Sequence, residues 1–200
     1  TKPCPSAYSP KKANRSYQMA TLPTNRAADL RASNPQDRSK NREGEKMEKI
    51  IVIGSPGAGK SSFSKKLKNI TKLPLYHIDM LYHKKDGTHI TKEELEEKLK
   101  EIFKTDKWII DGNYSKTLKE RFDRADLIIW LDYSTYAQVK GIFNRILKNY
   151  GKEKTEIPGC KERFNFTFFK YVITYNKKKR HIIVDNLNGI PEDKVLIFKK

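Results

Sequence analysis

The stretch Lys49-Ile50-Ile51-Val52-Ile53-Gly54-Ser55-Pro56-Gly57-Ala58-Gly59-Lys60-Ser61-Ser62 joins a short apolar run to a glycine-rich loop, a lysine and two hydroxyl side chains. It satisfies the pattern G-x-x-x-x-G-K-[ST], which predicts a strand, a phosphate-binding loop and a helix. Glycines permit positive φ and close backbone approach, so successive N–H groups can point at phosphate oxygens. The helix expected to begin near Lys60 directs the positive end of its dipole at the same anion.

This loop predicts a site for ATP or GTP. We expect Lys60 to bridge the β- and γ-phosphates and the Ser61 hydroxyl to take one coordination position of Mg²⁺. The residues expected to contact the nucleotide are Gly54, Ser55, Pro56, Gly57, Ala58, Gly59, Lys60, Ser61 and Ser62. The alternative is a glycine-rich turn that binds nothing. The apolar strand before the loop, and Phe63 and Leu67 on one face of the following helix, favour the phosphate site.

Length, charge and cysteine usage restrict the class of protein. The 200 residues suit one α/β domain plus a tail, and no apolar run approaches the ~20 residues of a membrane span. Cys4 and Cys160 match no metal or redox spacing, which favours a reduced, cytoplasmic setting. The net charge of +18 indicates an anionic partner. Because a nucleotide is itself anionic, this charge does not select nucleic acid.

Residues 1–46 differ in composition from the rest of the chain. They hold five prolines, ten basic and four acidic residues, and no periodic apolar pattern. Such a segment cannot bury enough surface to fold alone, so we expect a disordered or non-native N-terminal extension. A cleaved targeting peptide is the alternative, but four acidic residues argue against it. Met47 is a natural start for the folded domain, which we place at 47–200.

Three apolar runs each end in aspartate: 73–78 before Asp79, 108–110 before Asp111, and 126–131 before Asp132. Their alternation with helical patterns predicts a doubly wound parallel sheet, in which ligands bind outside the carboxyl ends of the strands.

Asp79 and Asp111 are therefore candidate site residues. Asp79 is expected to bind a substrate or to receive a hydroxyl proton; the alternative is a cap for a helix from Met80 onward. Asp111 is expected to hold Mg²⁺ through water or to orient a nucleophile; the alternative is a turn aspartate before Gly112.

The chain from residue 91 onward predicts further helices and a lid. The capping box at 91–94 begins one helix, and 136–150 forms another whose core stripe is Val139, Ile142, Phe143, Ile146 and Leu147. Arg145, before the loop at 151–158, is expected to be a lid cation that neutralises a transferring phosphoryl group; the alternative is a surface helix residue. A fifth strand is expected at 194–198. The helix expected after it is absent, so the chain is truncated or closes differently.

Other residues leave more than one interpretation. Arg121 and Arg124 could reach a substrate phosphate or only the surface. The run 177–180 could contact phosphate, but a solvated charge run is favoured. An aromatic stripe at helical spacing favours core packing over base stacking. It consists of Phe164, Phe168, Tyr171 and Tyr175.

With these motifs in view, the chain from Met47 onward resembles the small P-loop kinases of the adenylate-kinase-like group. It is most similar to the bacterial DNA topology modulation (FlaR-type) proteins. The segments that carry the resemblance are 51–61, 76–82, 108–114, 124–126, 159–160 and 177–180.

The resemblance implies a three-layer P-loop fold with a five-stranded parallel sheet in the order 2-3-1-4-5, and a lid and substrate region at about 145–180. It implies an acid at Asp79 close to the acceptor. Adenylate kinases carry Phe-Pro-Arg after the Asp-Gly pair, whereas this chain has Asn113-Tyr114-Ser115. The arginine that grips a monophosphate in those kinases has no counterpart at this position.

Two functions follow as hypotheses. The first is a magnesium-dependent kinase that transfers the γ-phosphoryl group of ATP to a small acceptor, such as a nucleoside or nucleotide. The second is a nucleotide-dependent DNA-binding regulator with a weak or vestigial kinase site. A GTP switch is disfavoured, because the chain has no N-K-x-D base-reading motif. The sequence leaves the acceptor and the oligomeric state open.

Overall fold

The computed structural model describes residues 47–84, 88–154, 157–161 and 164–200. The extension expected at 1–46 lies outside the described residues. The alternation of apolar strands and amphipathic helices read from the sequence is present in the described part.

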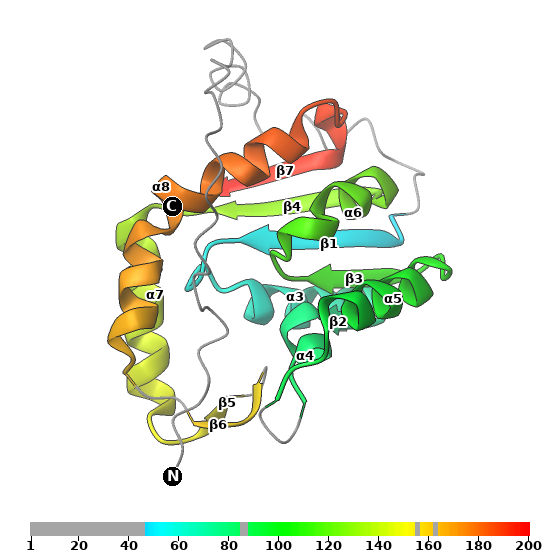
Figure 1. Cartoon of the computed structure of the whole chain (residues 1–200). Helices are drawn as coiled ribbons and strands as arrows, with labels where there is room; N and C mark the ends of the chain where they lie inside the picture. Colours follow the sequence, from blue (N-terminus) through cyan, green and yellow to red (C-terminus); the bar gives the residue numbers. More distant parts are fainter. Residues whose placement is uncertain (1–46, 85–87, 155–156, 162–163) are drawn as a thin grey trace. The chain divides into compact units, whose positions relative to one another are not determined.

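Five parallel strands form the central sheet, in the order β2-β3-β1-β4-β7 (Figure 1). β1 (Lys49–Gly54) lies in the middle, between β3 (Trp108–Asp111) and β4 (Leu127–Asp132). β2 (Leu75–His77) and β7 (Val195–Lys199) form the two edges. Because β7 is the fifth strand of this sheet along the chain, the expected order 2-3-1-4-5 is confirmed.

Helices cover both faces of the sheet, which gives the three-layer P-loop fold (Figure 1). α5, α6 and α8 pack on one face and α3 on the other. An antiparallel hairpin, β5–β6, stands between α7 and α8, within the region expected to form a lid. The bounds are α3 (Lys60–Thr71), α4 (Ile78–Tyr82), α5 (Lys92–Phe103), α6 (Leu118–Arg124), α7 (Thr135–Asn149), β5 (Glu153–Lys154), β6 (Ile157–Lys161) and α8 (Phe166–Leu187), with 3₁₀ turns at Ser115–Thr117 and Glu192–Lys194.

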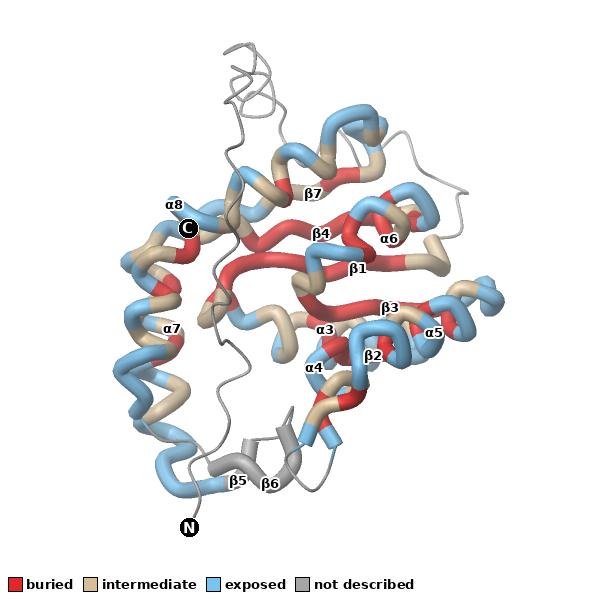
Figure 2. The backbone as a smooth tube through the Cα atoms, viewed as in Figure 1, coloured by how far each residue is buried: buried red, intermediate tan, exposed pale blue. Residues whose placement is uncertain are grey.

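The three central strands, β1, β3 and β4, are buried on both faces, as Figure 2 shows by the red of the central tube, whereas the edge strands β2 and β7 are only partly buried. Alternate residues of β1 enter two separate apolar clusters: Ile51 and Ile53 pack with the α5 side, and Ile50 and Val52 with the α3 side. This double burial explains why the strand has a continuous apolar run instead of an alternating pattern.

The predicted capping box of α5 is confirmed. The Thr91 hydroxyl accepts a hydrogen bond from the Glu94 N–H at 3.1 Å, and the Glu94 carboxylate accepts one from the Thr91 N–H at 2.6 Å. The apolar face after it is buried, and the Lys and Glu side chains between are exposed, as expected of a solvated face.

The predicted core stripe of α7 is wrong at two positions. Phe143 is 55% exposed and Leu147 65% exposed, whereas Gln138 and Ile142 are buried. The physical reason is that α7 meets its neighbours over a narrow strip. Helical periodicity gives the apolar face but not how much of that face finds a partner.

The aromatic stripe of α8 is buried only in part. Tyr175 is buried and Tyr171 half-buried, while Phe164 precedes the helix and is exposed. None of the described helices is both long enough and apolar enough to cross a membrane.

Candidate functional site

The phosphate loop, residues 54–61, leaves the carboxyl end of the central strand β1 and enters α3 (Figure 1). Gly57 and Gly59 have φ angles of 81° and 82°, in the left-handed region that glycine adopts without strain. The loop beyond the carboxyl end of β1 therefore has a backbone conformation that residues with a Cβ atom rarely adopt.

The N-terminus of α3 is open toward this loop. Its first backbone bond runs from the Phe63 N–H to the Gly59 carbonyl at 2.9 Å, so the N–H groups of the preceding residues point out of the helix end. The N-cap, Gly59, has no side chain to cap them, and the first turn contains no acidic residue. An anion is the partner that such a helix end favours.

Lys60 lies over the phosphate loop. Its ammonium donates a hydrogen bond to the Ser55 carbonyl oxygen at 3.1 Å. The cation is thus held beside the backbone N–H groups of the loop, where it can neutralise phosphate charge.

Asp111 occupies the last position of β3, opposite Val52 of β1 and His77 of β2 in the strand register. Its Oδ2 is 2.8 Å from His77 Nδ1, and both side chains are buried. Residues paired across neighbouring strands share a face of the sheet, so Asp111 lies on the α3 side with Val52. No spacing in the sequence predicted that His77 would bind this carboxylate.

The second carboxylate oxygen of Asp111 fits a metal site. Oδ1 is buried and has no hydrogen-bond partner among the described atoms. A buried carboxylate oxygen without a donor is costly, and a divalent cation or its bound water would satisfy it. Ser61 lies in the first turn of α3, on the same side of the sheet, so Ser61 and Asp111 are the residues that would hold Mg²⁺.

Asp79 lies in the first turn of α4 and is exposed. α4 follows β2 directly at the carboxyl edge of the sheet, and it packs against β6 of the β5–β6 hairpin. Asp79 therefore stands on a segment that contacts both the sheet and the hairpin.

Arg145 lies in α7 and is half-buried. Its guanidinium carbon is 5.9 Å from the centre of the Phe168 ring of α8, within cation–π range. The side chain is therefore held between α7 and α8, on the helix that leads into the hairpin.

Asn113 binds the phosphate loop, a role that the sequence did not predict. Its Oδ1 accepts a hydrogen bond from the Gly54 N–H at 3.1 Å. Its Nδ2 donates to the Gly54 carbonyl oxygen and, at 2.8 Å, to the Tyr175 hydroxyl. The first glycine of the phosphate loop is thereby joined to α8.

Gly141 is a second residue of this kind. A Cβ at Gly141 would lie 2.1 Å from the Gly57 carbonyl oxygen, and one at Gly57 would lie 2.3 Å from the Gln138 carbonyl oxygen. The backbones of α7 and the phosphate loop thus approach more closely than any side chain would allow. Periodicity cannot reveal this contact, because it depends on where α7 crosses the loop.

Arg121 neither reaches a substrate phosphate nor lies at the surface. It is fully buried and donates to the carbonyl oxygens of Gly112 at 2.8 Å and Tyr114 at 2.7 Å. Burial lowers the pKa of Arg121 to about 9, opposed by the attraction of Asp111. Its role is to stabilise the turn after β3. Arg124, by contrast, lies over the Phe103 ring at 5.1 Å.

Arg180 departs from the expected solvated run. Its guanidinium binds both carboxylate oxygens of Asp132, at 2.9 and 2.8 Å, and lies 5.2 Å from the centre of the Trp130 ring. This hydrogen bonding raises the pKa of Arg180. The pair ties α8 to the end of β4.

Replacing Arg121 with methionine is expected to lower the free energy of unfolding by about 2–4 kcal/mol, because the buried carbonyl groups of Gly112 and Tyr114 lose their donor. Denaturant unfolding followed by circular dichroism measures the change. Arg124→Met removes an exposed ion pair with Glu120 and should cost no more than about 1 kcal/mol. Equal effects of the two substitutions would contradict the structural role of Arg121.

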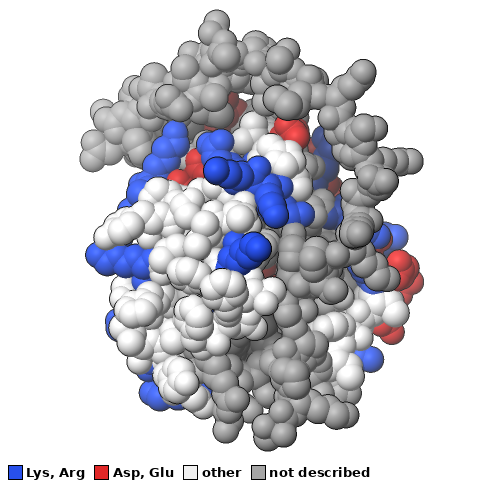
Figure 3. All heavy atoms as spheres, turned by 60° about the vertical axis from the view of Figure 1, so that its left-hand side comes forward, with Lys and Arg blue, Asp and Glu red and all other residues white. Residues whose placement is uncertain are grey.

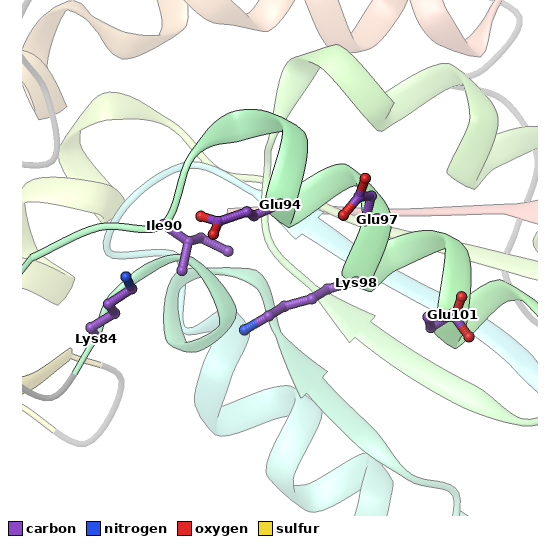
Figure 4. Close-up of a pocket in the computed structure, with 6 residues that line it drawn as sticks. All are labelled: Lys84, Ile90, Glu94, Glu97, Lys98 and Glu101. Carbon is purple, nitrogen blue, oxygen red and sulfur yellow. The ribbon is translucent and has the colours of Figure 1, made fainter.

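Lys and Arg side chains and a shallow groove occupy different parts of the described surface. Figure 3 turns the left-hand side of Figure 1 toward the viewer. Lys and Arg gather mainly in the upper part of the described surface, with few Asp or Glu beside them, and much of the remainder is uncharged. Such a group of cations favours an anionic ligand. A shallow groove follows α5 (Figure 4), lined by Lys84, Ile90, Glu94, Glu97, Lys98 and Glu101. No phosphate-loop residue lines the groove, so it is separate from the candidate site.

Known proteins provide a partial comparison. No family model matches the chain. An adenylate kinase of Thermosipho melanesiensis is 32% identical over 108 residues, which cover 52% of this chain and 49% of the relative. An adenylate kinase of Thermotoga petrophila is 30% identical over 109 residues, covering 53% and 49%. The chain thus spans about half the length of the curated relatives it matches.

Among solved structures, a shikimate kinase of Bacteroides thetaiotaomicron aligns with a TM-score of 0.49 and 17% identity, over 77% of this chain and 86% of that one. A shikimate kinase of Acinetobacter baumannii aligns with a TM-score of 0.47 and 13% identity, over 74% and 83%. At these scores the assignment of the fold rests on the strand order itself.

Proposed function

We propose that the chain is a magnesium-dependent kinase that transfers the γ-phosphoryl group of ATP to a small acceptor. The observation that carries this proposal is the phosphate loop, with Lys60 lying over it and the open N-terminus of α3 directed toward it. The partial match to adenylate kinases supports the same class of reaction.

Each candidate residue has a defined role in this proposal. The loop N–H groups and Lys60 bind the phosphates and neutralise the charge that develops during transfer. Ser61 and Asp111 hold Mg²⁺, which when bound shields the phosphate oxygens. Asp79 orients the acceptor hydroxyl or takes its proton.

Arg145 supplies the lid cation. Arg145 belongs to α7, the helix that leads into the β5–β6 hairpin, and its guanidinium lies against the Phe168 ring of α8. Closure of that hairpin over α4 would exclude water from the transfer.

The finer assignment is to the small kinases that resemble DNA topology modulation proteins, with a nucleoside or nucleotide as acceptor. It rests on the segments 76–82 and 108–114. The phosphate-binding arginine of adenylate kinases has no counterpart after Gly112. Arg121, nine residues along, is bound to main-chain carbonyls and does not replace it.

The test is ADP formation from ATP and Mg²⁺ by residues 47–200 against a panel of nucleosides, nucleoside monophosphates and small hydroxy compounds. Turnover stimulated by one acceptor class, and lost in Lys60→Ala, is the expected result. Tight ATP binding without stimulated turnover by any acceptor would contradict the kinase proposal.

A nucleotide-dependent DNA-binding regulator is the second candidate, favoured by the net charge of +18 and by the Lys and Arg side chains in the upper part of Figure 3. It predicts DNA affinity that falls steeply as salt rises. Residues 47–200 must be used, because the basic segment 1–46 could bind DNA nonspecifically. Absent or salt-insensitive DNA binding would remove this candidate.

A further inference from the structure

One side chain holds both main-chain polar groups of the residue where the phosphate loop begins. The Gly54 N–H donates to Asn113 Oδ1 at 3.1 Å, and the Gly54 carbonyl accepts from Asn113 Nδ2. These two bonds fix the orientation of the peptide groups on either side of Gly54.

Gly54 needs such a fixed partner. Its φ is 153°, and an added Cβ would lie 2.6 Å from the Leu131 carbonyl oxygen, so only glycine fits between β1 and β4 here. Glycine is also the residue with the widest range of backbone conformations. The ladder to Leu131 of β4 restrains Gly54 on one side, and the two bonds from Asn113 restrain it on the other, where the loop leaves β1.

The restraint is itself anchored on α8. Asn113 Nδ2 donates to the Tyr175 hydroxyl at 2.8 Å, and Tyr175 is buried. Its ring meets the Tyr171 ring edge to face, with centres 5.7 Å apart. The buried ring therefore presents its hydroxyl at a fixed point, and that point sets the position of the Asn113 amide.

We propose that Tyr175 is a positioning residue that acts through Asn113 to hold the Gly54 peptide in the orientation that binds phosphate. The proposal rests on the phosphate site of the proposed function. It needs only nucleotide binding, not transfer, and so is independent of the acceptor. Because Tyr175 belongs to α8, nucleotide affinity depends on how α8 packs against the turn after β3.

The test is the Kd for Mg·ATP of the whole chain with Tyr175→Phe, which removes one oxygen and keeps the ring. The expected rise is about 3- to 10-fold, the equivalent of one hydrogen bond. Tyr171→Phe, one helical turn earlier, is the matched control and should leave the Kd unchanged. Thermal unfolding of each variant shows that α8 remains packed.

A double-mutant cycle separates positioning from a general loss of packing. In an Asn113→Ala background, Tyr175→Phe should have no further effect on the Kd, because its link to Gly54 is already broken. If Asn113→Ala does not fold, Asn113→Leu, which keeps the side-chain volume but has no amide to bond Tyr175 or Gly54, takes its place. An equal effect of Tyr175→Phe in both backgrounds, or no effect in either, overturns the proposal.

These outcomes differ from failure of the proposed function. A wild-type chain that binds no Mg·ATP would overturn the phosphate site and this inference together. A wild-type chain that binds Mg·ATP, with a Tyr175→Phe variant that binds equally well, would overturn the positioning role alone.

Discussion

Replacing Lys60 with alanine is expected to lower acceptor-stimulated ADP formation by at least about 10²–10³-fold, the usual loss when one group that stabilises transition-state charge is removed. The ammonium is held over the phosphate loop by the Ser55 carbonyl, so no conformational search precedes its contact with phosphate. Charge develops on the transferring group during the reaction, and no other cation of the loop stands in its place. Steady-state kinetics with saturating acceptor measures the loss.

The matched control is Lys66→Ala, an exposed lysine of the same helix. It removes the same charge from α3 but faces solvent, and its turnover should stay close to that of the wild type. Wild-type turnover in Lys60→Ala, with the protein folded, would remove Lys60 from the site. An equal loss in the two variants would indicate a general charge effect instead of a specific contact.

Replacing Gly141 with alanine is expected to weaken Mg·ATP binding at least about tenfold and to lower the free energy of unfolding by about 1–3 kcal/mol, the usual cost of overpacking. The new Cβ would lie 2.1 Å from the Gly57 carbonyl oxygen, so α7 must move away from the phosphate loop. Isothermal titration with Mg·ATP and denaturant unfolding measure the two effects.

Helix propensity alone predicts the opposite change in the free energy of unfolding. Alanine in a helix interior is intrinsically better than glycine by about 0.8–1 kcal/mol, so a stabilised Gly141→Ala variant with unchanged affinity would disprove the close contact. Lys140→Ala, at the exposed neighbouring position of α7, controls for a change of helix propensity alone.

The features predicted well from sequence are those that a local pattern determines. The capping box at Thr91 needs only four consecutive residues, and the apolar run of β1 signals a strand buried on both faces whatever its neighbours are. The strand order was also predicted correctly, but that prediction came from the resemblance to a known group and not from any local pattern.

The features that the sequence missed depend on contacts between distant segments. Asn113 and Arg121 are ordinary polar residues in the chain, and their roles appear only when Gly54, Tyr175 and Gly112 are brought beside them. The same cause misplaced Phe143, since a helical pattern gives an apolar face but no partner for it. The roles of Lys60, Asp79, Asp111 and Arg145 stay predictions until the kinetic tests are made.

The central position of β1 has a consequence for synthesis on the ribosome. Lys49 pairs with Trp108 and Ile50 with Leu127, so β1, which emerges before β3 and β4, cannot complete its ladders until both of them have been made. At a synthesis rate of about 5–20 residues per second, roughly 4–15 s pass between the synthesis of the four apolar residues of β1 and that of β4. During that interval the nascent chain presents an unpaired, aggregation-prone segment, and we expect it to be a preferred target of holdase chaperones.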